Sequence, residues 1–545
     1  MAINKTLRIN ASDNIAVALQ NLSAGDAHRV GNQTIKLKTD VEIKHKFALK
    51  NFDIGDEIIM YGDLMGKATT PILRGSVITR QNVLHDAHGF TTKTKDYTWT
   101  PPDVSQFKNR TFDGFHRSDG QVGTQNVWLI IPLVFCENRN VTVIHEALTK
   151  ELGYAKTNDY RDLVRGLKNR EGVESIDFQS VTPLSKTNKR HFPNIDGIKV
   201  LTHQGGCGGI RQDSETLCAL FAGYVNHPNV GGATILSLGC QNAEVTTFKR
   251  ELERRNPHFD KPLVIVDQQH SGTEKQMIDA AIIDTFKGLH IANKVERQPA
   301  PLSKLTIGVK CGGSDGFSGI SANPAMGFTA DLLVTLGGSI VLAEFPELCG
   351  QEQSLLDRCE TKDIADKFAV LQTTYAQRAE AVGSGFDMNP SPGNIRDGLI
   401  TDAMKSAGAA KKGGMSPVTD VLDYTEPVKK AGLNLLCTPG NDVECTTAMT
   451  GSGTNLIIFS TGLGTPTGNP VCPVLKVSTN TTLAKRMADI IDIDTGSIIT
   501  GEHSIEEMGT AMLEFCIETA SGRVIPKAVA LEQDDFIPWK RGVSL

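Results

Sequence analysis

From residue 113 onward, short apolar runs alternate with segments of helical periodicity. Leu305–Val309 is one such run, and the glycine-rich turn Lys310–Gly319 follows it before the next helical pattern. Repeated strand–turn–helix units predict mostly parallel sheets covered by helices. We therefore expect two α/β domains, one at 113–300 and one at 301–545.

The first part of the chain has a different pattern. Between residues 7 and 90, apolar runs of four or five residues are broken by Gly, Asn and Asp, which is typical of short strands joined by turns. Residues 91–112 are polar, contain Pro101-Pro102 and show no apolar periodicity. The pattern predicts a small β-rich domain followed by a linker.

Composition excludes several classes of protein. A chain of 545 residues is expected to form several domains. Its net charge of −6 and the lack of a basic block argue against binding to nucleic acid. No apolar run is long enough to cross a membrane, and the N-terminus lacks the apolar core of a signal peptide. Eleven cysteines without a disulfide pattern indicate a reducing, cytoplasmic setting. Assembly into a homo-oligomer is compatible with this composition.

Thiols and carboxylates recur where the predicted strands end. Because ligands gather at the carboxyl ends of parallel strands, these side chains are candidates for one shared site. The alternative for each cysteine is a small buried side chain with no chemical role. The candidate metal ligands are Cys136, Cys207, Cys240, Cys311 and Glu344.

The turns themselves suggest a small anionic ligand. Gly205-Gly206-Cys207-Gly208-Gly209 could present backbone N–H groups to an anion, but it matches neither the phosphate-binding loop nor the dinucleotide fingerprint. No C-x-x-C pair is present, so a zinc ribbon is not indicated. The residues alone favour a metal- or thiol-bearing α/β enzyme.

Several motifs together resemble the altronate/galactarate dehydratase family of sugar-acid hydro-lyases, in the same order along nearly the whole chain. They are Asp13–Leu19, His45–Leu49, Asp119–Asn126, Leu238–Asn242, Cys311–Gly316 with Asn323-Pro324, Asn389–Asn394, Pro439–Asp442 and Thr461–Pro466.

The resemblance implies a SAF-type N-terminal domain and loss of water from a sugar acid. The preferred reaction is altronate to 2-dehydro-3-deoxy-gluconate, assisted by Fe2+, with another divalent metal or an iron–sulfur cluster as alternatives. Galactarate dehydration or elimination of sulfite by a related lyase stays open, as does a non-catalytic anion-binding protein that kept the fold. The partner would be a small-molecule sugar acid.

Site residues follow from the matched motifs. His45, His203 and Lys46 are candidates for acid–base roles, and His203 could instead bind metal. If the β domain is a lid, His45 would approach the crevice from outside; if it is an assembly module, His45 is structural. The candidate substrate-binding residues are Gln125, Asn126, Gly312, Gly313, Ser314, Asp315, Asn441 and Asp442.

Two positions depart from the family pattern, which has Arg where Gln125 stands and Gly where Lys44 stands. Gln125 lacks the charged fork with which an Arg would hold a substrate carboxylate. The departure therefore bears on which sugar acid is bound more than on the class of reaction.

Overall fold

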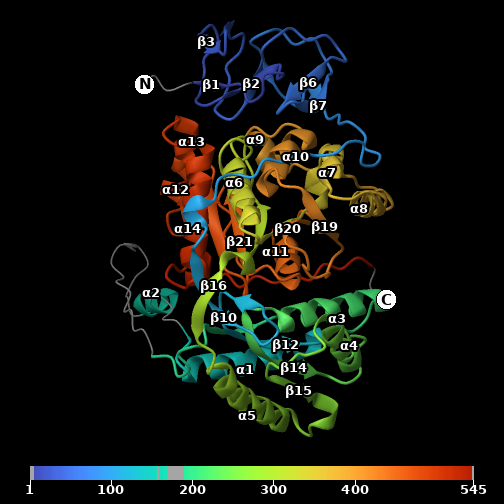
Figure 1. The fold of residues 1–545 in the computed structure, drawn as a ribbon, viewed down its shortest axis with the longest axis vertical. Coiled ribbons are helices and arrows are strands. Elements are labelled where there is room, and N and C mark those ends of the chain that lie inside the picture. The colour runs from blue at the N-terminus through green and yellow to red at the C-terminus, as the bar shows by residue number, and fades with distance from the viewer. Residues whose placement is uncertain (1–4, 156–158, 169–188, 543–545) are drawn as a thin grey trace.

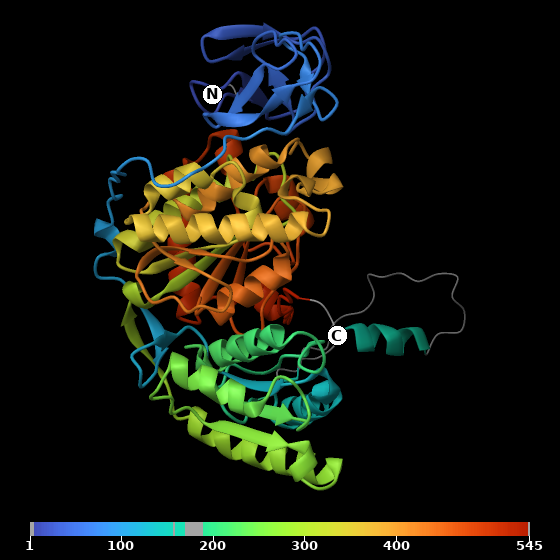
Figure 2. The ribbon, with the colours of Figure 1, turned by 90° about the vertical axis from the view of Figure 1, so that its right-hand side faces the viewer.

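The computed structural model describes residues 5–155, 159–168 and 189–542, and it arranges them as three stacked regions. A β domain lies at one end, a four-stranded α/β region lies at the other, and a larger seven-stranded α/β region lies between them (Figure 1). The view turned by 90° shows the same order (Figure 2). This confirms the predicted fold class. No helix within the described residues is long and apolar enough to cross a membrane.

The β domain is built from short antiparallel strands in three small sheets, with orders β1-β2-β5-β8, β6-β7-β9 and β3-β4. Alternating side chains, as in Glu57–Met60, turn an apolar face inward, here Ile58 and Met60, and leave the other face partly in water. The strands are β1 (Thr6–Leu7), β2 (Ile15–Ala18), β3 (Ala27–Val30), β4 (Gln33–Lys36), β5 (Lys46–Ala48), β6 (Glu57–Met60), β7 (Asp63–Ala68), β8 (Val77–Ile78) and β9 (Val83–Leu84).

The predicted linker has no regular structure until a short 3-10 helix, η1 (Ser105–Phe107), yet it is tied to the seven-stranded region. Lys93 donates to the Asp357 carbonyl at 2.7 Å, and the Thr94 N–H donates to the Asp357 carboxylate at 2.8 Å. The linker therefore has a fixed path.

A three-stranded antiparallel sheet joins the two α/β regions, in the order β11-β10-β16. The alternating strand–helix pattern did not predict it, and the expected boundary at residue 300 falls inside one of its strands. Its strands are β10 (Thr111–His116), β11 (Val122–Gly123) and β16 (Arg297–Pro301).

The four-stranded sheet is fully parallel, in the order β13-β12-β14-β15. Its central strands are buried along their whole length, as expected for a sheet covered on both faces. The elements are β12 (Val127–Pro132), η2 (Phe135–Glu137), α1 (Asn138–Glu151), α2 (Asp159–Lys168), β13 (Gly197–Val200), α3 (Arg211–Asn226), β14 (Val230–Ser237), α4 (Val245–Arg255), β15 (Leu263–Asp267), η4 (Gln268–His270) and α5 (Glu274–Ala292).

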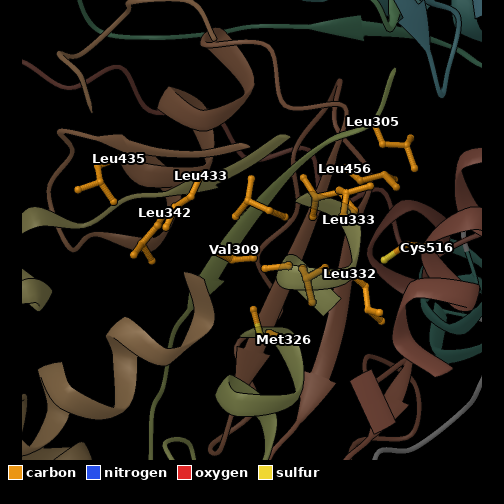
Figure 3. Packing of buried hydrophobic residues seen from close by; sticks show 14 of the residues in the cluster. Leu305, Val309, Met326, Leu332, Leu333, Leu342, Leu433, Leu435, Leu456 and Cys516 are labelled. Carbon is orange, nitrogen blue, oxygen red and sulfur yellow. The ribbon is translucent and has the colours of Figure 1, made fainter. Parts of the chain in front are cut away.

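The seven-stranded sheet is also parallel, in the order β19-β20-β18-β17-β21-β22-β23. Leucine and valine side chains from its strands, such as Val309 and Leu456, pack against α6 (Ala322–Thr335), which contributes Leu333, and α14 (Ile505–Ala520) in a continuous core (Figure 3). Its strands are β17 (Thr306–Cys311), β18 (Ser339–Leu342), β19 (Val418–Leu422), β20 (Gly432–Leu436), β21 (Leu456–Thr461), β22 (Val474–Ser478) and β23 (Ile493–Asp494).

The helices of this region cover both faces of the sheet. The helical pattern predicted over Leu355–Val382 is two helices, because Thr361 caps the second one by accepting the Ile364 N–H. The helices are η5 (Leu302–Lys304), α6 (Ala322–Thr335), η6 (Phe345–Leu348), α7 (Glu352–Arg358), α8 (Lys362–Glu380), η7 (Phe386–Met388), α9 (Pro392–Arg396), α10 (Asp402–Ala410), η8 (Lys411–Gly413), α11 (Asp442–Gly451), α12 (Thr481–Arg486), α13 (Gly496–Thr500), α14 (Ile505–Ala520) and α15 (Lys527–Ala530).

Candidate active site

The carboxyl edge of the seven-stranded sheet carries a buried network of lysines and acidic groups, which we call the lysine edge. Its members are Lys310, Cys311, Glu344, Glu347, Lys405, Lys412, Asp442 and Lys476.

Glu344 lies at the centre of the lysine edge. It follows β18 with φ 70°, a left-handed conformation that costs a non-glycine residue about 1–3 kcal/mol. Its carboxylate is fully buried and forms ion pairs with Lys310 and, at 2.8 Å, with Lys412. The backbone is therefore held in a strained form that directs this carboxylate between two ammonium groups.

The other acidic groups are paired in the same way. Lys310 also contacts Asp442 at 2.8 Å, and Lys405 contacts Glu347 at 2.7 Å. The Lys412 ammonium lies 3.0 Å from the Cys311 sulfur, whose thiol donates to Glu347. Each predicted ligand on this edge therefore has a lysine or a hydrogen-bonded neighbour.

These contacts set the protonation states. Burial raises the pKa of Cys311 and keeps it a thiol, against the effect of Lys412. Burial alone would lower the pKa of Lys310, but the charges of Glu344 and Asp442 raise it well above its usual value. Burial would likewise raise the pKa of Glu347, but Lys405 and Lys310 hold it below its usual value. Lys310 is thus an ammonium ion and Glu347 a carboxylate, whereas Cys311 is a neutral thiol.

Cys311 and Glu344 were predicted to bind metal, and their ligand atoms lie within 4.8 Å of each other and of Glu347. However, Lys412 lies 3.0 Å from the sulfur and 2.8 Å from Glu344. A dication here would meet these ammonium charges at short range. The metal role of Cys311 and Glu344 stays a prediction, and in the present arrangement lysine ammonium groups lie where a cation would contact both ligand atoms.

Lys476 differs from the other lysines of this edge. It lies on β22, fully buried, with its Nζ 3.4 Å from the centre of the Phe459 ring. Lys310 flanks the same ring on the other neighbouring strand, at 5.7 Å. The Lys476 Nζ has no hydrogen-bond partner, and burial lowers its pKa to about 7. A neutral amine with a free lone pair can accept a proton.

Sequence reasoning missed Lys310, Lys405, Lys412, Lys476 and Glu347 as site residues. A signal was present for two of them, because Lys310 and Lys476 interrupt strands whose other side chains are mostly apolar. Burying an ammonium is costly, so a lysine inside such a strand indicates a paired or functional group. Lys405 and Lys412 carry no comparable signal.

The loop after Cys311 links the lysine edge to the β domain. A side chain at Gly312 would lie 2.5 Å from the Asp442 carboxylate, and Gly313 has φ 57°, so both positions need glycine. Asp315 is saturated, because it accepts bonds from Ser318, Thr479 and the Phe317 N–H. Of the predicted substrate-binding residues, Asp442 belongs to the lysine edge, and Gly312 and Gly313 lie directly beside it.

Ser314 and Asn441 have local structural roles in the same loops. The Ser314 carbonyl accepts a bond from Asn394 at 2.7 Å, and the Asn441 side chain caps α11 by accepting the Val443 N–H. These contacts shape the loops around the lysine edge.

The β domain contacts this edge through the predicted catalytic segment. Lys44 forms ion pairs with Asp397 at 2.7 Å and Asp315 at 3.0 Å, and Lys46 donates to the Gly398 carbonyl. Burial lowers the pKa of Lys46 to about 7. Lys44 has φ 72°, the conformation that favours the glycine expected there. His45, between the two lysines, is half-buried, and its Nδ1 lies 3.3 Å from the Ile43 carbonyl oxygen of its own loop.

The carboxyl edge of the four-stranded sheet differs, and we call it the thiol edge. Cys136, Cys207 and Cys240 lie there and are the exposed cysteines of the chain. Their loops are joined, because the Phe135 N–H donates to Gly205 and the Ala243 N–H donates to Gly206. Thiolates suit iron or an iron–sulfur cluster. The three sulfur atoms do not, however, form one of the ligand groups within 4.8 Å among the described residues.

The structure does not bring the four predicted cysteine ligands together. Cys311 belongs to the lysine edge, while the other three belong to a different sheet. A cavity of about 620 Å³ lies beside the thiol edge, between the glycine-rich loop and Phe536–Lys540.

His203 lies at this cavity, but both of its ring nitrogens are occupied. Nε2 lies 2.7 Å from the Pro132 carbonyl oxygen, and Nδ1 accepts the Gly205 N–H at 3.0 Å. Burial lowers its pKa, which keeps the ring neutral. The predicted acid–base or metal role is not supported by this geometry, and the ring instead shapes the glycine-rich loop.

Gln125 and Asn126 lie at the opposite end of the four-stranded sheet, because they precede β12. The Asn126 side chain donates to the Asn194 and Ala292 carbonyls, and its oxygen accepts a bond from Arg117. The substrate-binding role of Gln125 and Asn126 stays a prediction; in this structure the Asn126 side chain stabilises the loop before β12 through these bonds.

Comparison with known proteins covers the whole chain. Three family models match in succession: the altronate/galactarate dehydratase SAF domain at residues 4–86, the second domain of D-galactarate dehydratase/altronate hydrolase at 114–293, and the C-terminal domain of D-galactarate/altronate dehydratase at 302–544.

Curated relatives match over similar lengths. The chain is 34% identical to altronate dehydratase of Escherichia coli and 33% identical to altronate dehydratase of Bacillus subtilis, with 99% of both chains covered in each case. It is 30% identical to galactarate dehydratase (L-threo-forming) of Escherichia coli, over 95% of this chain and 93% of that one.

Proposed function

Because the chain belongs to the altronate/galactarate dehydratase family, we propose that it removes water from a sugar acid, with altronate as the preferred substrate. In this reaction the C2–H bond breaks, the C3–O bond breaks, and the hydroxyl leaves as water. The enol that remains becomes 2-dehydro-3-deoxy-gluconate. The chemistry needs a base for the C2 proton, an acid for the C3 hydroxyl and positive charge near the enediolate.

The observation that carries this proposal is the buried amine of Lys476, without a hydrogen-bond partner, at the lysine edge. We assign it the role of base. Its pKa of about 7 leaves a large neutral fraction at neutral pH, which a base in this role requires. Asp442 then lies close enough to attract the ammonium that forms.

The remaining roles follow from the same edge. Ammonium groups of Lys310 and Lys412, held in place by Glu344, supply preorganised positive charge for the enediolate. His45 is the candidate acid for the departing hydroxyl. Its support is the docking of its neighbours Lys44 and Lys46 against residues 397 and 398.

The iron requirement stays part of the proposal, and the thiol edge has the donors for it. Cys136, Cys207 and Cys240 are the residues that would hold an iron ion or cluster. Bound iron would supply Lewis-acid stabilisation of negative charge on oxygen. The proton transfers described above are assigned to Lys476 of the lysine edge and to His45 of the β domain.

The test is an anaerobic assay of the full-length protein, with and without Fe2+, on altronate, galactarate and related sugar acids. The expected result is a 2-keto-3-deoxy acid from altronate at a higher kcat/KM than from any other acid. A higher kcat/KM for galactarate would mean that galactarate is the preferred substrate, while the proposed dehydration reaction would stand. No keto-acid product from any of them would overturn the proposed reaction.

A further inference from the structure

A second group of potential metal ligands lies where the β domain meets the seven-stranded region. His85 directly follows β9, Cys349 follows η6, and Asp402 is the first residue of α10. Their ligand atoms all lie within 4.8 Å of one another. The three side chains come from three separate segments, so only the folded chain brings them together.

Asp402 provides an independent indication of a bound cation. Its side chain is buried, with 1% exposure, and its Oδ2 atom accepts no hydrogen bond of good geometry. Burial raises the pKa of Asp402 well above its usual value, although the Cys349 thiol and Lys405 favour the charged form. A buried carboxylate oxygen without a donor is costly, and a cation would compensate it.

The surroundings differ from those of Cys311, Glu344 and Glu347, where lysines already hold the ligand atoms. Lys405, one turn along α10 from Asp402, directs its ammonium to Glu347 at 2.7 Å and to Asn389 at 2.8 Å. It therefore compensates the neighbouring carboxylate of the lysine edge.

The ligand types define the ion. An imidazole nitrogen, a thiolate and a carboxylate oxygen suit Zn2+, Fe2+ or Co2+, whereas Ca2+ and Mg2+ prefer oxygen ligands. One hydrogen bond of the His85 ring is long, since Nδ1 accepts the Ala403 N–H at 3.3 Å. A metal bond of about 2.0–2.1 Å to the imidazole would replace it.

We propose that His85, Cys349 and Asp402 bind one divalent transition-metal ion that joins the β domain to the seven-stranded region. Cys349 is two residues from Glu347, and Asp402 is three residues from Lys405, so the ion would fix both segments that carry the Lys405–Glu347 ion pair. The proposal does not depend on the reaction, because it concerns binding alone.

The experiment is a Co2+ titration of the full-length, chelator-treated protein in a C136S/C207S/C240S background, which removes the exposed thiols. We expect one Co2+ per chain and a thiolate-to-cobalt charge-transfer band in the near ultraviolet. C349S should lose the band, and H85A and D402N should weaken binding by about 10–100-fold or more. H88A, which removes an exposed histidine three residues away, is the matched control and should bind as the background does.

A thermal measurement keeps the test decisive if a variant folds poorly. Zn2+ should raise the Tm of the background protein and of H88A, and should leave the Tm of D402N unchanged. Absence of both the band and the Tm shift would overturn the site. So would a band that persists in C349S, or equal losses of affinity in H85A and H88A.

Discussion

The lysine edge and the thiol edge have the same architecture and opposite chemistry. Each is the carboxyl edge of a parallel sheet, and each carries cysteine at a strand end or in the loops that follow the strands. At the lysine edge Cys311 is buried beside Lys412, whereas Cys136, Cys207 and Cys240 of the thiol edge are exposed. The Cys311 thiol is a neutral member of a network of ions. The three thiols of the thiol edge are accessible to solvent and could bind a metal.

The difference comes from what covers each edge. The β domain and α10 cover the lysine edge, and α10 with η8 brings Lys405 and Lys412 onto it. The thiol edge faces the C-terminal segment Phe536–Lys540 across the cavity. The role of a cysteine at a strand end is therefore not set by its position alone. Segments distant in sequence decide whether the thiol is buried among charged groups or exposed to solvent.

The largest expected effect is on turnover in K476M. If Lys476 is the base, its replacement by a side chain of similar length should lower kcat by about 10²–10⁴-fold. Stability should not fall, since removing a buried, unpartnered amine is neutral or stabilising by about 1–4 kcal/mol. Steady-state kinetics and chemical denaturation check both. Unchanged kcat would remove Lys476 from the mechanism and leave the thiol edge as the better candidate.

The pH dependence follows from the lowered pKa. Wild-type kcat should fall as the pH drops below about 7, where Lys476 becomes protonated. Since the unfolded chain binds this proton up to a higher pH, wild-type stability should rise with pH between about 7 and about 10. The stability advantage of K476M should therefore be largest below pH 7 and shrink above it. A constant difference would show that Lys476 titrates normally.

A smaller effect is expected on stability in K412M. The variant leaves one oxygen of the buried Glu344 carboxylate without its ammonium partner, at a cost of about 3–5 kcal/mol. The double variant K412M/E344Q should recover part of that loss in chemical denaturation. The matched control is K199M on β13, an edge strand of the four-stranded sheet; the partly exposed ion pair between Lys199 and Asp534 should contribute about 0–1 kcal/mol. Equal losses in K412M and K199M would contradict the contrast between the edges.

The sequence predicted the positions of these edges better than their chemistry. Apolar runs identified β17, β18 and β20, and so placed Cys311 and Glu344 at strand ends. What surrounds Cys311 depends on Lys412, which is 101 residues away in sequence, and no periodicity reports such a contact. Strand-end position is local information, whereas charge pairing is set by tertiary packing.

Two of the strands that the sequence did not predict were missed for physical reasons. β16 contains two prolines, which cannot donate to a ladder and so conceal a strand; it pairs only with β10, at the edge of its sheet. β22 contains Lys476, which interrupts its apolar pattern. Lys476 both conceals β22 and forms part of the site. A lysine inside an otherwise apolar run was therefore itself a sign of function.

The cover of the lysine edge is tested by two variants of Lys44. Both K44M and K44G lose the ion pairs with Asp315 and Asp397, but only glycine relieves the left-handed backbone. We expect K44M to lose about 1–3 kcal/mol of stability, and K44G to be more stable than K44M by about 1–2 kcal/mol. Chemical denaturation measures the order. If K44G is less stable than K44M, the backbone at this position is not strained.

The smallest effect is expected at the thiol edge, and it tests exposure directly. In the native, metal-free protein a thiol reagent should modify Cys136, Cys207 and Cys240 rapidly and leave Cys311 unmodified until unfolding, because only the first three are exposed. The C136S/C207S/C240S variant should lose the rapid phase with a stability change within about 0.5 kcal/mol, as expected for surface positions.

Protein purified anaerobically with iron shows whether these thiols are free or bind the metal. If these thiols hold iron, the rapid phase should appear only after a chelator is added, and bound iron should be absent from the triple variant. Rapid modification of Cys311 in the folded protein would show instead that the lysine edge opens to solvent, and the contrast in burial on which both assignments rest would no longer hold.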